Sequence, residues 1–73
     1  MAVLNETEFK IKDEYIKLGQ VLKAVGLCES GVDAKFAIQD GLVNVNGEIC
    51  LQRGKKIVSG DVVEFEGNKV YIK

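Results

Sequence analysis

The sequence contains no histidine, no proline and no tryptophan, and only two of its 73 residues are cysteine. Without histidine it lacks the side chain used most often as a general base or metal ligand. It also lacks a Gly-x-Ser-x-Gly elbow, a phosphate-cradling Gly-x-x-x-x-Gly-Lys loop and a carboxylate pair that spacing would force together. We therefore expect no enzymatic activity, no metal or other cofactor, and no small-molecule substrate.

The two cysteines, Cys28 and Cys50, are far apart in the sequence, and neither belongs to a Cys-x-x-Cys pair. Neither has a neighbouring base that would activate a thiolate nucleophile. Because free cysteine behaves as a small hydrophobic residue, we expect buried or half-buried free thiols. A disulfide between them is the alternative.

Long apolar runs are absent too, and none approaches the ~20 residues of a membrane span. The first residues, Met-Ala-Val-Leu-Asn-Glu, lack the basic and apolar regions of a signal peptide. With 47% hydrophobic and 29% charged residues, the composition is that of a globular protein. We expect one cytoplasmic domain over residues 1–73, acting as a monomer away from membranes.

The charge balance is slightly acidic, with a net charge of −1 and a pI of about 5.3. This balance argues against a protein that coats nucleic acid through bulk charge. Acidic residues are frequent in residues 1–14, whereas Arg53, Lys55 and Lys56 fall close together. Any site for a polyanion must therefore be a local patch.

Residues 30–47 carry the strongest local structure signals. Ser30 is a favourable N-cap for a short helix over about residues 31–40, and Gly41 is suited to end it. Asn46-Gly47 is the dipeptide that best forms a two-residue hairpin turn. This stretch predicts a helix, a stop, a strand and a tight turn in direct succession.

An apolar stripe with helical spacing predicts an earlier helix over about residues 15–26. Gly19 should weaken this helix by about 1 kcal/mol relative to alanine, unless something packs closely against it. Small residues on the second helix, Ala34 and Ala37, would let the two helices approach each other. The stripe of the first helix consists of Leu18, Val21, Leu22 and Val25.

The remaining segments predict short strands. One strand precedes the helices, and the others follow them, so the order favours an α+β fold. We expect the helix pair to lie on one side of a small, mostly antiparallel sheet. The expected strands are residues 8–12, 43–45, 48–51, 62–65 and 69–72, with a basic loop over 52–56.

Val32 and Phe36 form a further apolar pair, on a different side of the second helix. Two interpretations of Phe36 stay open. The favoured one is that its ring packs under the sheet. The other is that it is an exposed ring on which an RNA base stacks.

Cationic and amide side chains suggest a binding surface. If the helix pair and the basic loop share a face, these side chains form a patch suited to phosphates and sugar hydroxyls. The alternative is that they are ordinary solvated surface residues. The candidates are Lys17, Gln20, Lys23, Lys35, Gln39, Arg53, Lys55 and Lys56.

A pattern of residues along the chain resembles a known family. It comprises Leu18, Leu22, Gly26-Leu27, Ser30, Ala34-Lys35, Ile38, Gly41, Val43, Val45-Asn46-Gly47 and Gly60-Asp61-Val62. Over about residues 16–65 the chain resembles the S-four RNA-binding domain, also called the alpha-L motif. It is most similar to the short, stand-alone bacterial members of the YaaA type.

The resemblance implies non-catalytic binding of structured RNA, such as ribosomal RNA or a ribosome-assembly intermediate, through the two helices and the loop between them. It adds Ser30 and Gly31 to the candidates, and it places Ser30 and Lys35 at positions that face RNA. Many family members have arginine where this chain has Gly31, so the missing guanidinium should weaken binding or shift it to Arg53. The alternative function is a protein–protein adaptor that binds through the acidic N-terminal strand.

Overall fold

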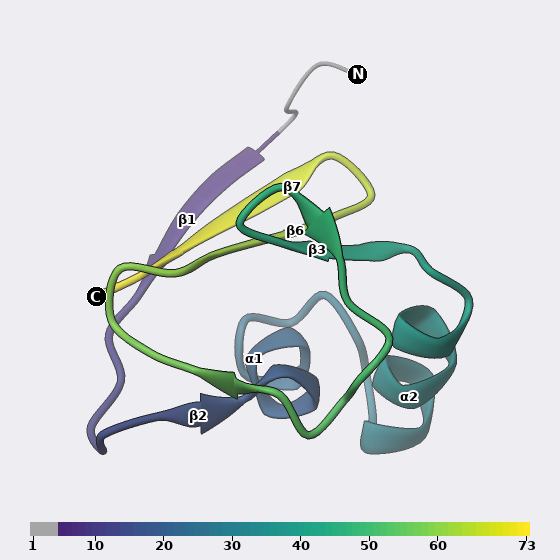
Figure 1. The fold of residues 1–73 in the computed structure, drawn as a ribbon, viewed down its shortest axis with the longest axis horizontal. Coiled ribbons are helices and arrows are strands. Elements are labelled where there is room, and N and C mark those ends of the chain that lie inside the picture. The colour runs from purple at the N-terminus through teal and green to yellow at the C-terminus, as the bar shows by residue number, and fades with distance from the viewer. Residues whose placement is uncertain (1–4) are drawn as a thin grey trace.

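The computed structural model describes residues 5–73, and it places two helices against a sheet (Figure 1). This arrangement confirms the predicted α+β class and its mostly antiparallel sheet. None of the helices in this part of the chain is long and apolar enough to cross a membrane. The elements, in order, are β1 (Asn5–Phe9), β2 (Ile16–Lys17), α1 (Leu18–Ala24), α2 (Gly31–Gln39), β3 (Val43–Val45), β4 (Glu48–Ile49), β5 (Lys56–Ile57), β6 (Val62–Phe65) and β7 (Asn68–Ile72).

The main sheet has five strands in the order β1-β7-β6-β3-β4. Its neighbours are antiparallel except for β1 and β7, which lie side by side in parallel at one edge (Figure 1). Strands β2 and β5 form a separate two-stranded antiparallel ribbon. The ends of the described chain therefore meet in the main sheet, and the ribbon joins the start of α1 to the segment after β4.

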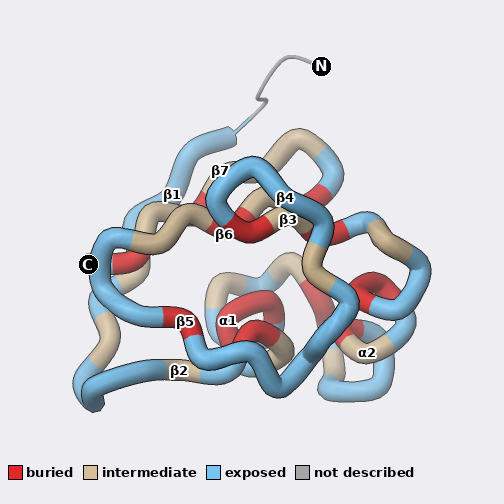
Figure 2. Tube along the Cα trace, in the orientation of Figure 1, coloured by how far each residue is buried: buried red, intermediate tan, exposed pale blue. Residues whose placement is uncertain are grey.

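The hydrophobic core lies between the helices and one face of the main sheet (Figure 2). Helix α1 contributes Leu18 and Leu22, both with no exposed surface. Helix α2 contributes Ala34 and Ile38, also fully buried, and the two helices pack against each other as predicted. The small side chain of Ala34 permits this close approach. From the sheet the core receives Val43, Val45, Val63, Phe65, Val70 and Ile72.

Helix α1 is shorter than predicted, because residues 15–17 are not helical. Ile16 and Lys17 instead pair with Ile57 and Lys56. The helical periodicity begins only at Leu18, and residues far along the chain supply the strand partner. Other boundaries also move: β1 covers residues 5–9 rather than 8–12, and β4 ends at residue 49 rather than 51.

The predicted caps and turns are confirmed. The Ser30 hydroxyl accepts a hydrogen bond from the Asp33 N–H at 3.3 Å. Gly41 has a φ of 76° after the end of α2, the left-handed conformation that closes a helix. Asn46 and Gly47 have φ angles of 53° and 86°, as a turn with two positive φ values requires.

Two of the family-pattern segments are hydrogen bonded to each other, and we call this contact the Asn46–Asp61 junction. The Asn46 side-chain amide donates to the Asp61 carboxylate at 3.0 Å, and its Oδ1 accepts from the Val62 N–H at 2.9 Å. The other Asp61 oxygen accepts from the Val58 N–H at 2.9 Å. The junction therefore joins the β3–β4 turn to the turn before β6.

Phe36 is 56% exposed, so the favoured interpretation of this residue is wrong. It lies on the side of α2 opposite the buried stripe of Ala34 and Ile38, where the sheet does not reach. The prediction for the cysteines is confirmed: Cys28 is buried, Cys50 is half-buried, and both are free.

Candidate functional site

A groove of about 570 Å³ lies between α1, the N-terminus of α2 and the loop before β5. Three of its lining side chains are cationic, and among the residues that the structure describes none of the lining is acidic. We call it the basic groove. Its lining consists of Lys17, Gly19, Gln20, Lys23, Gly31, Val32, Arg53 and Gly54.

Backbone hydrogen bonds hold the basic loop at the start of α1. The Leu18 N–H donates to the Lys55 carbonyl at 2.9 Å, and the Gly19 N–H donates to the Arg53 carbonyl at 3.1 Å. A Cβ added to Gly19 would lie 3.7 Å from that Arg53 oxygen. The loop thus packs closely against Gly19 and satisfies N–H groups that the first turn of a helix leaves unpaired. This packing places Arg53 beside α1.

The start of α1 also fixes the polar side chain of Gln20 at the groove. The Lys17 N–H donates to Gln20 Oε1 at 3.4 Å. Lys17 lies directly opposite Lys56 across the β2–β5 ribbon. Like charges at such a cross-strand position are unfavourable in the absence of an anion. Lys56 itself extends over Tyr15, with its Nζ 4.9 Å from the ring centroid.

Helix α2 presents its N-terminus to the groove through Gly31 and Val32. The first N–H groups of a helix lack partners within the helix, and the helix dipole adds partial positive charge there. The Ser30 hydroxyl already accepts the Asp33 N–H. A Cβ placed on Gly31 would meet no atom within 4 Å, so the position has room for a side chain.

The structure gathers some of the predicted site residues and separates others. Lys17, Gln20, Lys23, Gly31 and Arg53 line one groove. The remaining predictions lie outside its lining. Lys55 lines a different hollow, beside β4, and Lys56 is at the ribbon; Ser30 caps α2, while Lys35 and Gln39 lie further along that helix.

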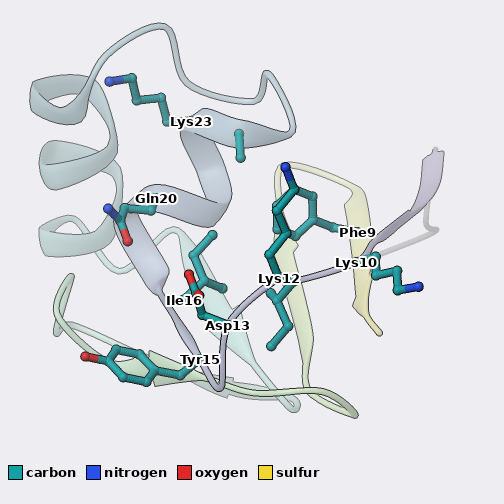
Figure 3. A pocket seen from close by; sticks show the side chains of 10 residues that line it. Phe9, Lys10, Lys12, Asp13, Tyr15, Ile16, Gln20 and Lys23 are labelled. Carbon is teal, nitrogen blue, oxygen red and sulfur yellow. The ribbon is translucent and has the colours of Figure 1, made fainter.

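Sequence reasoning missed a second hollow, of about 630 Å³, between residues 9–16 and α1 (Figure 3). We call it the N-terminal hollow. Gln20 and Lys23 line it as well as the basic groove, so the two hollows adjoin along α1. The alternation of residues 8–12 predicted only an edge strand, and no local signal showed that this segment faces α1.

The face of the sheet that points away from the helices has a different character. Glu6 and Glu64 flank Lys69 in register across β1, β7 and β6. The Tyr71 hydroxyl donates to the Glu6 carboxylate at 2.7 Å, and this hydrogen bond raises the pKa of Tyr71. We call this surface the acidic sheet face. The basic groove and the acidic sheet face lie on opposite sides of the sheet.

The chemistry available in the groove is anion binding. Ammonium, guanidinium and amide groups meet a helix N-terminus there. Burial raises the pKa of the Cys28 thiol, with Asp33 and Glu66 adding to the effect, so this cysteine stays a neutral thiol at pH 7. Within residues 5–73 no histidine, cysteine or acidic residues cluster closely enough to hold a metal ion.

Comparison with known proteins identifies the family. The sequence model of the S4 domain matches residues 9–73. The chain is 39% identical over 61 residues to YbcJ of Escherichia coli, covering 84% of this chain and 87% of that protein. It is 46% identical over 57 residues to RlbA of Bacillus subtilis, which is named a probable ribosome maturation protein. This match covers 78% of this chain and 80% of RlbA. The chain belongs to the S4 domain family.

A solved structure agrees with this assignment. The solution structure of Escherichia coli YbcJ superposes with a TM-score of 0.69 at 38% identity, covering 89% of this chain and 84% of that one. That structure is described as having an alpha-L motif involved in RNA binding. The predicted family and the alpha-L fold are therefore confirmed.

Proposed function

We propose that this protein binds structured RNA in the basic groove without catalysing a reaction. The observation that carries the proposal is the meeting of Lys17, Lys23 and Arg53 with the N-terminus of α2 in one groove of a chain whose net charge is −1. A local cationic groove in an acidic protein favours a specific polyanion over bulk attraction. The S4 family membership points to the same ligand.

Each part of the groove suits a different part of an RNA backbone. Arg53 offers a fork of N–H donors to one phosphate, and Lys17 and Lys23 supply further positive charge. The α2 N-terminus adds backbone N–H groups, which compensate in part for the missing arginine at Gly31. Because the side-chain oxygen of Gln20 accepts the Lys17 N–H, its amide N–H groups are left to donate to sugar hydroxyls.

The RNA in this proposal is ribosomal RNA or a ribosome-assembly intermediate in the bacterial cytoplasm. The name of RlbA, a relative that the chain matches over 78% of its own length, supports this choice. Three cations in the groove predict a shallow dependence on salt, with a slope of log K against log [salt] of about −2 to −3.

Cosedimentation with purified ribosomal subunits and their precursors across a salt series tests the proposal. Wild-type protein should associate with one particle in a salt-sensitive way, and Lys17→Glu with Arg53→Glu should abolish the association. Lys69→Gln is the control, because it removes a positive charge on the acidic sheet face without placing a third carboxylate beside Glu6 and Glu64.

Two results would overturn the proposal. One is absence from every ribosomal fraction at low salt. The other is association that survives both ribonuclease treatment and the groove reversal while the variant stays folded. That second result would favour a protein adaptor that uses the Glu6 and Glu8 strand.

A further inference from the structure

We infer that the N-terminal hollow holds an unpaired nucleotide of the RNA whose structured part lies in the basic groove. This inference rests on the proposed function and names a second contact with the same ligand. It places the N-terminal segment, which lies before the predicted family pattern, in the RNA interface.

The floor of the hollow is apolar and preformed. Phe9, Ile11 and Ile16 are partly buried and pack against the core, so they are held in place without a ligand. Tyr15 is 39% exposed at the margin of the hollow, and because Lys56 Nζ lies over one face of its ring, the other face is the one left for a base. Apolar and aromatic surfaces of this kind accept the flat face of an unstacked base. The volume of about 630 Å³ is within the range of small-ligand pockets.

The charge around this floor favours a nucleotide over an apolar peptide. Lys10, Lys12 and Lys23 line the hollow with one acid, Asp13. In Figure 3, Lys12 and Asp13 lie near Phe9 and Ile16, whereas the side chains of Lys10 and Lys23 extend away from them. A base on the apolar floor would leave its phosphate near Lys12, where charge attraction adds to base contact.

The hollow continues the basic groove along α1. Gln20 and Lys23 line both. A strand of RNA that leaves the groove on this side therefore passes two polar side chains before it reaches the hollow. In Figure 3, Gln20 and Tyr15 point to the same side of the α1 and β2 segment.

Photocrosslinking tests this inference with the full chain and fragmented, thiouridine-substituted ribosomal RNA, with crosslinked protein positions mapped by mass spectrometry. We expect crosslinks at Tyr15 or Phe9 in addition to the basic groove. The crosslinked nucleotides should be unpaired in the RNA. Crosslinks confined to the groove would overturn the inference and leave the proposed function intact, whereas no crosslinks at either place would overturn both.

Substitutions provide a second, independent readout by fluorescence anisotropy with the same RNA. Tyr15→Ala should lower the affinity about tenfold, as loss of one stacked base does, and Tyr15→Phe should restore it. Lys12→Gln, at an exposed position that cannot disturb the core, should weaken binding about threefold. Lys69→Gln on the acidic sheet face is the control and should have no effect.

Unchanged affinity in both Tyr15→Ala and Lys12→Gln, with binding still lost in the Lys17→Glu and Arg53→Glu protein, would also overturn the inference. In that case the hollow does not contact RNA. If the groove variant bound as well as the wild type, the proposed function would fail as well.

Discussion

The Asn46–Asp61 junction and the basic groove use polar side chains in opposite ways. At the junction, the side chains of Asn46 and Asp61 form hydrogen bonds with each other and with nearby backbone N–H groups. In the groove, Lys17, Lys23 and Arg53 have exposed side chains on a surface shaped by backbone contacts. The residues most useful for recognising the family therefore maintain the fold. The residues proposed to bind RNA have less distinctive sequence surroundings.

The largest expected effect is on stability, at the junction. Asn46→Ala removes two side-chain hydrogen bonds, worth about 1 kcal/mol each, and replaces asparagine, which tolerates positive φ, with alanine, for which this conformation costs about 1 kcal/mol more. We expect the free energy of unfolding to fall by about 3 kcal/mol. Denaturant titration followed by circular dichroism measures this change.

Asn46→Gly separates the two causes, because glycine adopts positive φ without strain. It should lose about 2 kcal/mol, less than the alanine variant. Stability within experimental error of the wild type in both variants would contradict the role given to the junction. Folded Asn46→Gly protein should bind ribosomal RNA as the wild type does.

The second effect is on binding, at the groove. Lys17→Glu combined with Arg53→Glu should lower RNA affinity by at least about tenfold at moderate salt, because two phosphate contacts are lost and repulsion is added. Stability should change by no more than about 0.5 kcal/mol, since both side chains are exposed. Anisotropy and denaturant titration on the same protein measure both quantities. If the variant lost stability as well as affinity, the groove residues would also maintain the fold, and the difference in role between groove and junction would be contradicted.

A gain of function sharpens the same comparison. Gly31→Arg should raise RNA affinity about fivefold, because the position lines the groove, has open space for a side chain and would gain a phosphate-binding fork. Gly31→Ala is the matched control, since it makes the same backbone change without the guanidinium. Equal affinities of the arginine and alanine variants, measured by anisotropy, would show that position 31 does not face RNA.

The smallest effect concerns pH. Burial raises the pKa of the Cys28 thiol, so the folded protein holds this proton more tightly than the unfolded chain does. The resulting stability is fully present below the ordinary thiol pKa and is lost as the pH rises above about 9. Cys28→Ala should make the free energy of unfolding less dependent on pH between about 8 and 10.

A pH dependence unchanged in Cys28→Ala would assign the effect to another group. Tyr71 is the first such group to test, because its pKa is raised by the hydrogen bond to Glu6. Tyr71→Phe removes that titration and keeps the ring.

Local signals predicted much of the fold. The Ser30 cap, the Gly41 stop and the Asn46-Gly47 turn each depend on residues within a few positions of one another, and all three are confirmed. The predicted start of α1 was wrong, because Ile16 and Lys17 form a strand with residues about forty positions away. The parallel pairing of β1 with β7 could not be predicted from local sequence either, because it joins the two ends of the described chain.

Prediction of the candidate site was less complete. The cationic and amide side chains could be counted in the sequence, but the sequence did not predict which of them lie together. Lys55 and Arg53 are two positions apart, yet they line different hollows because the loop between them turns against α1. Phe36 shows the same limit, since helical periodicity alone did not decide which side of α2 faces the sheet.

The family pattern, the α+β class and the turns could be predicted without coordinates, because they follow from backbone preferences and side chains that act over short distances. Only the tertiary structure decided that Lys17, Lys23, Gly31 and Arg53 share one groove. The physical reason is that the Arg53 carbonyl bonds to the Gly19 N–H, which brings a distant loop onto the first turn of α1. The N-terminal hollow arises in the same way. Residues 9–16 form one side of it, and their position beside α1 depends on tertiary contacts that the local sequence does not predict.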